Sequence, residues 1–104
     1  TEEIFFECER ELYGGDVRVV KVAVNKDDDE FVIEQLPTKD FGYVVTRGEV
    51  IWTANYVFFN GNEYGITYGI NRETLELTLD DTSIIVGSCE IVESKNKFWE
   101  IWEI

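Results

Sequence analysis

Apolar and polar residues alternate along most of this chain with a period of two. In residues 74–80 three leucines alternate with polar residues, and in residues 30–34 Phe31 and Ile33 share one parity. Near the start, Ile4, Phe6 and Cys8 share a parity in the same way. Successive side chains of a strand point to opposite faces of a sheet, so this pattern predicts strands with one buried face.

Two longer apolar runs predict irregular strands. Residues 17–25 are rich in valine, and their inward parity changes around Val19 and Val20, which predicts a β-bulge there. Residues 82–93 predict one long strand, and Gly87 near its middle is typical of a bend or a bulge.

Turn-forming residues separate the predicted strands at intervals of about 8–12 residues. They lie at Gly14-Gly15-Asp16, Arg47-Gly48, Asn60-Gly61-Asn62 and Asp80-Asp81. No segment has a long helical period. The 104 residues suit one domain, so we expect a single acidic domain over residues 1–104. Its predicted fold is all-β, an antiparallel small barrel or sandwich of seven or eight strands.

Composition narrows the classes of function. The formal net charge is −13, which disfavours direct binding of nucleic acid, because that affinity depends on positive charge. The chain has no histidine, the commonest general base, and no glycine-rich phosphate loop or nucleophile elbow. The acidic run at residues 27–30 is interpreted as a solvated hairpin tip. We therefore expect a protein that is not an enzyme and that holds no cofactor and no metal.

Acidic residues are expected to form surfaces of a single sign. Glu7, Glu9 and Glu11 share one strand parity, as do Glu76 and Asp80. One interpretation is that this charge only keeps the protein soluble. The other is a negative surface that occupies a basic groove on a host or viral protein, because carboxylates bind Arg and Lys as phosphates do.

The last seven residues, 98–104, include five large apolar side chains. One interpretation is a final edge strand that closes the sheet. The other is a tail in which Trp99, Trp102 and Ile104 dock on a partner or on a second copy of the chain, since tryptophan is enriched in binding hot spots. Self-association as a structural or virion protein is thus a further hypothesis.

Aromatic residues are concentrated between positions 52 and 68. We expect them to build the core, so that the 15 aromatic side chains of the chain fill the interior. The alternative is a lined cavity for a small apolar ligand, as in a lipocalin-like barrel.

Cys8 and Cys89 are expected to be buried on neighbouring strands or across the core, either as free thiols or as a disulfide. No apolar run is long enough for a membrane span, so no membrane association is expected. The first residues lack the cationic and apolar regions of a secretory signal. The sequence therefore predicts a cytoplasmic protein, in the host cytoplasm if it is encoded by a phage.

One part of the chain resembles known proteins. Residues 68–77 read Tyr-Gly-Ile-Asn-Arg-Glu-Thr-Leu-Glu-Leu, and residues 87–92 read Gly-Ser-Cys-Glu-Ile-Val. This resembles the C-terminal motif of small uncharacterised β proteins of bacteria and their phages, which often carry an early cysteine, as at Cys8. The resemblance implies a compact β fold and no catalytic residue. Within the motif, Arg72 is expected to have a structural role at a turn, bonded to carbonyls or to an acid such as Glu90 or Glu93.

Overall fold

The computed structural model describes residues 3–12, 14–25, 27, 29–60 and 67–92, which form one sheet of nine antiparallel strands. The strands are β1 (Glu3–Glu11), β2 (Val17–Asn25), β3 (Glu30–Gln35), β4 (Val44–Glu49), β5 (Ile51–Trp52), β6 (Tyr56–Asn60), β7 (Thr67–Asn71), β8 (Glu76–Leu79) and β9 (Asp81–Val92). The described residues contain no helix. The predicted all-β fold is confirmed, with slightly more strands than expected.

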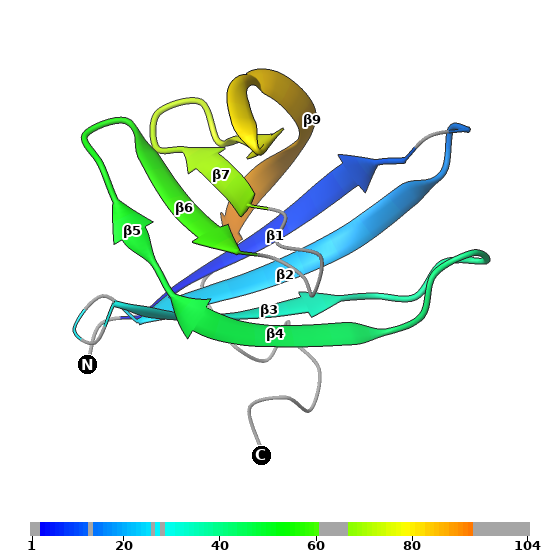
Figure 1. Cartoon of the computed structure of the whole chain (residues 1–104), viewed down its shortest axis with the longest axis horizontal. Helices are drawn as coiled ribbons and strands as arrows, with labels where there is room; N and C mark the ends of the chain where they lie inside the picture. The colour runs from blue at the N-terminus through cyan, green and yellow to red at the C-terminus, as the bar shows by residue number, and fades with distance from the viewer. Residues whose placement is uncertain (1–2, 13, 26, 28, 61–66, 93–104) are drawn as a thin grey trace.

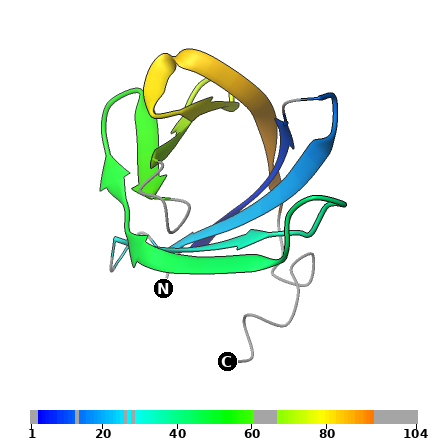
Figure 2. The same ribbon diagram turned by 45° about the vertical axis from the view of Figure 1, so that its right-hand side comes forward.

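The sheet curls into a nearly closed barrel. Its strand order is β4-β3-β2-β1-β9-β8-β7-β6-β5, so that β4 and β5 lie at its two edges. Only Val50 separates these two strands in the chain, and its backbone N–H donates to the carbonyl of Asp29 at 2.7 Å. The two edges are therefore consecutive pieces of one chain segment, and the strands follow one another round a ring (Figures 1 and 2).

One turn that the sequence predicted lies at a different position, Val50. Arg47-Gly48 was expected to divide two strands, but β4 runs through both residues and pairs with β3 along its whole length. Inward-facing Gly48 gives room to a ring, because a Cβ at this position would lie 3.0 Å from the Phe31 side chain. The chain instead turns at Val50, where a buried apolar side chain anchors the corner.

Alternate residues of most strands point into the barrel and form one core. The aromatic residues link its sides, since the ring centroids of Phe31 and Phe59 lie 5.6 Å apart and those of Phe59 and Tyr68 lie 6.1 Å apart. The buried cluster consists of Phe6, Cys8, Val20, Val22, Val24, Phe31, Ile33, Val50, Val57, Phe59, Tyr68, Ile70 and Leu77. Tyr56 and Phe58 have the opposite parity and stack on each other with centroids 5.4 Å apart.

The prediction of a β-bulge at Val19 and Val20 is wrong. The pairing of β2 with β1 is unbroken from one end to the other, and even-numbered residues point inward throughout. The apparent change of parity arises because Lys21 and Ala23, on the outer side, are buried as well. A strand buried on both faces loses its alternating pattern.

The irregularity lies instead between β8 and β9. Leu77 pairs with Gly87 but Thr78 pairs with Ile85, which leaves Val86 as the extra residue of a bulge. The predicted long strand with a glycine at a bulge is thus present as β9. Gly87 also faces β1 at very close range, because a Cβ placed on it would lie 1.9 Å from the backbone oxygen of Glu9.

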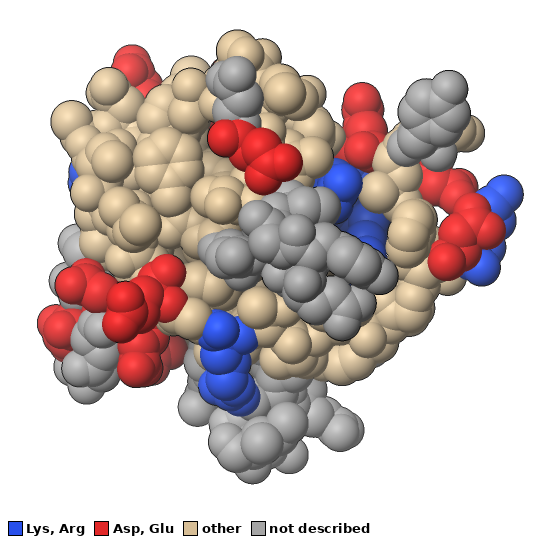
Figure 3. Space-filling view, in the orientation of Figure 1, with Lys and Arg blue, Asp and Glu red and all other residues tan. Residues whose placement is uncertain are grey.

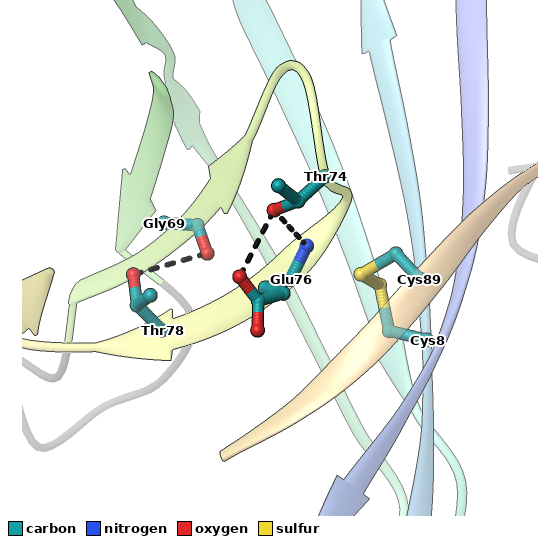
Figure 4. Close-up of a disulfide and its surroundings, with 6 residues drawn as sticks. All are labelled: Cys8, Gly69, Thr74, Glu76, Thr78 and Cys89. Atoms are coloured by element: carbon teal, nitrogen blue, oxygen red, sulfur yellow. Dashed lines mark hydrogen bonds between the residues drawn. A yellow bond between two sulfur atoms is a disulfide. The ribbon is translucent and has the colours of Figure 1, made fainter. Parts of the chain in front are cut away.

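The first and last of the described strands are also joined covalently. Cys8 and Cys89 are register partners on β1 and β9, and their sulfur atoms form a disulfide (Figure 4). Cys8 is fully buried, and Cys89 is half-buried against the same core. Of the two states that the sequence left open, the structure shows the disulfide.

We expect Gly87→Ala to destabilise the fold severely. The added methyl group would overlap the backbone of β1, and a backbone atom cannot move away as a flexible side chain can. The expected loss is about 3 kcal/mol or more of unfolding free energy, measured by urea denaturation. Gly42→Ala is the matched control: its Cβ would meet no atom within 4 Å, so a change within about 0.5 kcal/mol is expected. Equal stability of the two variants would contradict this account of the β1–β9 contact.

The disulfide is expected to contribute strongly to stability. It links residues 81 positions apart, and closure of a loop of that length corresponds to about 4.5 kcal/mol in the chain-entropy model. Cys8→Ala/Cys89→Ala should therefore unfold with about 2–5 kcal/mol less free energy. Added reductant should destabilise the natural protein and leave the double variant unchanged. A reductant effect on the double variant would show that another process is being measured.

Candidate functional site

Acidic side chains lie on the outer side of the barrel where β1 meets β9. Glu7 and Glu90 are register partners across this pair of strands, with the outward parity opposite to that of Cys8 and Cys89. Two like charges placed directly opposite each other destabilise a sheet. Repulsion between these two carboxylates therefore destabilises the β1–β9 pairing on the outer side of the barrel.

The next outward row adds two more carboxylates. Ser88 of β9 is the register partner of Glu9 on β1 and of Glu76 on β8. Neighbouring strands lie about 4.8 Å apart, so the backbones of Glu9 and Glu76 are about 10 Å apart. We call Glu7, Glu9, Glu76 and Glu90 the acidic face.

One base and several apolar side chains border the acidic face. Lys21 is the register partner of Glu7 on β2, and it lies opposite Glu34 on its other side. A shallow depression of about 300 Å³ is lined by Glu7, Glu9, Val19, Ser88, Cys89 and Glu90. A second of about 260 Å³ is lined by Glu9, Glu11, Val17, Ile85, Val86, Gly87 and Ser88.

The structure separates Asp80 from the other acids predicted for a binding surface. Asp80 follows β8 with a φ of 58°, and its Oδ1 accepts a hydrogen bond of 2.9 Å from the backbone N–H of Thr67. It therefore stabilises the end of the β7–β8 pair where β7 begins and β8 ends. Glu76 stays on the outer side, where its Oε1 accepts a hydrogen bond of 3.1 Å from Thr74 Oγ1 (Figure 4).

Glu90 was not predicted as part of an acidic surface, although a signal for it exists in the sequence. In an antiparallel pair, residue numbers of partners have a constant sum, so a Cys8–Cys89 pairing also places Glu7 opposite Glu90. The tail residues Trp99, Trp102 and Ile104 lie outside the described residues. Their predicted role in binding stays a prediction.

Arg72 lies in the turn between β7 and β8, and it contacts the turn between β5 and β6. Its Nη1 donates to the carbonyl of Thr53 at 2.8 Å, and its guanidinium lies 5.5 Å from the centroid of the Trp52 ring. Its backbone N–H donates to the carbonyl of Asn55. These contacts are structural and connect two corners of the barrel.

Polar side chains that were not predicted from the sequence also point into one end of the barrel. Arg10 of β1 and Arg18 of β2 are register partners with inward parity. Tyr68 of β7 lies beside them, accepts a hydrogen bond from Arg10 Nη1 and donates one to Gln35 Oε1 at 3.3 Å. Burial raises the pKa of the Tyr68 phenol above its usual range, while the nearby charge of Arg10 acts in the opposite direction.

The described residues show no metal centre, because no three of their Asp, Glu or Cys side chains are grouped closely enough to hold an ion. That part of the chain also has no helix of the length and apolarity needed to cross a membrane. No protein family, no curated protein and no solved structure matches this chain. The resemblance to small bacterial and phage proteins therefore stays a prediction.

Tyr68 predicts a pH dependence of stability at the alkaline end. An unfolded tyrosine ionises near pH 10, whereas the buried phenol holds its proton to higher pH. The unfolded state therefore loses its proton first, and stability falls as the pH rises above about 10 towards the pKa of the folded state. Urea denaturation across this range should show a shallower fall for Tyr68→Phe. Tyr56→Phe, which removes a hydroxyl from the outer side, should leave the fall in place, and an equal effect of both would contradict the assignment.

Proposed function

We propose that this protein is a non-enzymatic binding protein whose acidic face binds a basic, amphipathic segment of another protein. The observation that supports the proposal is that Glu7 and Glu90 lie directly opposite each other on the paired strands β1 and β9. A partner that places Lys or Arg between these carboxylates relieves their repulsion and forms charge-assisted hydrogen bonds.

The surroundings of the acidic face specify the partner further. Val17 and Ile85, beside Glu9 and Glu11, expose 49% and 55% of their surface. Charge mainly speeds the encounter and gives specificity, whereas buried apolar contacts supply more of the affinity. A segment that carries both basic and apolar side chains therefore fits this surface better than a purely basic one.

The other hypotheses have weaker support. A carrier of an apolar ligand needs room inside the barrel, and thirteen core residues point into that space. Self-association through residues 98–104 stays a prediction from the sequence. The cytoplasmic location also stays a prediction, and the disulfide bears against it, because such bridges persist mainly in oxidising compartments.

The proposal predicts that one pair of substitutions raises stability and weakens binding. Glu7→Gln/Glu90→Gln removes the like-charge pair, so its unfolding free energy should rise by about 0.5 kcal/mol. Its affinity for a synthetic Lys/Leu peptide with one apolar face should fall about tenfold, measured by isothermal titration calorimetry. A Lys/Ser peptide of equal length and charge should bind the natural protein more weakly than the Lys/Leu peptide.

Glu30→Gln/Glu49→Gln is the matched control. These residues are also register partners of like charge on exposed positions, but on β3 and β4. The control removes the same number of charges and should bind the Lys/Leu peptide nearly as well as the natural protein. Equal weakening in both variants, or equal binding of both peptides, would show that only the net charge attracts the peptide.

A further inference from the structure

Two arginines face each other inside one end of this strongly acidic protein. Arg10 and Arg18 are register partners on β1 and β2, with the parity of the core residues Cys8 and Val20. Side chains at such positions have Cβ atoms about 5 Å apart. Only 7% of the Arg18 surface is exposed. Arg10 is half-buried beside it, so two like charges lie close together at this end of the barrel.

Among the described residues, the partners of both guanidinium groups are neutral. Arg10 donates to the Tyr68 hydroxyl and lies 5.5 Å from the centroid of its ring. Arg18 donates from Nε to the carbonyl of Leu36 at 3.1 Å and from Nη2 to that of Gly42 at 2.5 Å, and it lies 5.6 Å from the Phe41 ring centroid. Within the described residues neither arginine contacts a carboxylate.

Several N–H donors of Arg10 and Arg18 have no acceptor among the described residues. Each guanidinium has five N–H donors, and the described residues accept one hydrogen bond from Arg10 and two from Arg18. The Nε of Arg10 is buried and has no hydrogen-bond partner. A buried donor without a partner carries a desolvation penalty, and more so on a charged group. An acceptor with negative charge would remove this penalty.

The acidic residues of β1 do not neutralise the pair. Glu9 and Glu11 flank Arg10 in the chain, but alternate residues of a strand point to opposite faces, so these carboxylates lie outside the barrel. Figure 3 shows basic side chains set back in a hollow, with acidic side chains around the rim of the molecule. The acidic side chains of β1 therefore do not accept hydrogen bonds from Arg10 and Arg18, and the positive charge of this pair stays without a hydrogen-bonded carboxylate from that strand.

We propose that this end of the barrel is a binding site for a small oxyanion, a carboxylate or phosphate group held between Arg10 and Arg18. Guanidinium groups bind both anions through paired N–H donors. The hydrogen bond to Gln35 orients the Tyr68 hydroxyl, and the bonds from Arg18 to Leu36 and Gly42 fix the position of its guanidinium. The site is independent of the acidic face, which lies on the other side of the sheet.

The test is titration of the full chain with three anions at constant ionic strength: inorganic phosphate, acetate and octanoate. We expect saturable binding by calorimetry and a rise in melting temperature with at least one of them. Tightest binding of phosphate would identify a phosphorylated ligand. Tighter binding of octanoate than of acetate would identify a carboxylate attached to an apolar group.

Substitutions of single arginines distinguish binding at this site from a general effect of positive charge. Arg10→Met and Arg18→Met should each weaken the dissociation constant at least about tenfold. Arg47→Met removes the same charge from the exposed outer side of β4 and should change it less than about twofold. Arg10→Lys keeps the charge without the paired donors and should also weaken binding. It therefore tests the site even if the methionine variants do not fold.

The Nε–H resonance of Arg10 provides a direct measurement on the natural protein. In an arginine-labelled sample this resonance should shift along the same saturation curve as the calorimetric titration. Absence of saturable binding for all three anions would overturn the proposal. So would an Arg10 resonance that does not move at saturation, or equal weakening by Arg47→Met.

Discussion

The contact between β1 and β9 decides how the rest of this molecule is arranged. It joins the first described strand to the last, and without it the strands would form two separate meanders, β1–β4 and β5–β9, connected only through the chain at Val50. The contact depends on Gly87, because any larger side chain would overlap the Glu9 backbone, and on the Cys8–Cys89 disulfide. Both features lie in the same few residues, so steric fit and covalent linkage fix one register.

That register also determines which charged side chains face outward and which face inward. Side chains alternate between the faces with a period of two, so a slip of one residue would exchange all of them. In the observed register Glu7 and Glu9 lie outside with Glu90, while Arg10 lies inside with Cys8. The acidic face and the arginine pair are therefore two consequences of one pairing.

Local alternation made much of the fold predictable, and the failures have physical causes. Phe31, Ile33 and Leu77 are buried as their parity indicates. The parity of β2 was misread because its outer side is buried too, and the turn at Val50 was missed because closure of the barrel, which is not a local property, places it there. Glu90 required the register of β9, which only the pairing of the two cysteines could have supplied. Arg10 did have a local signal, since it shares the apolar parity of Phe6 and Cys8.

The separation of charge across a single layer of strands has a consequence for recognition. The outer carboxylates reduce the net field of the two arginines but do not occupy their N–H donors, because they project from the opposite side of the sheet. With a net charge of −13, the whole molecule repels an approaching anion. An anion bound inside would therefore depend on directional hydrogen bonds rather than on long-range attraction. This arrangement favours anions whose oxygens match the spacing of paired guanidinium donors over simple ions that offer charge alone.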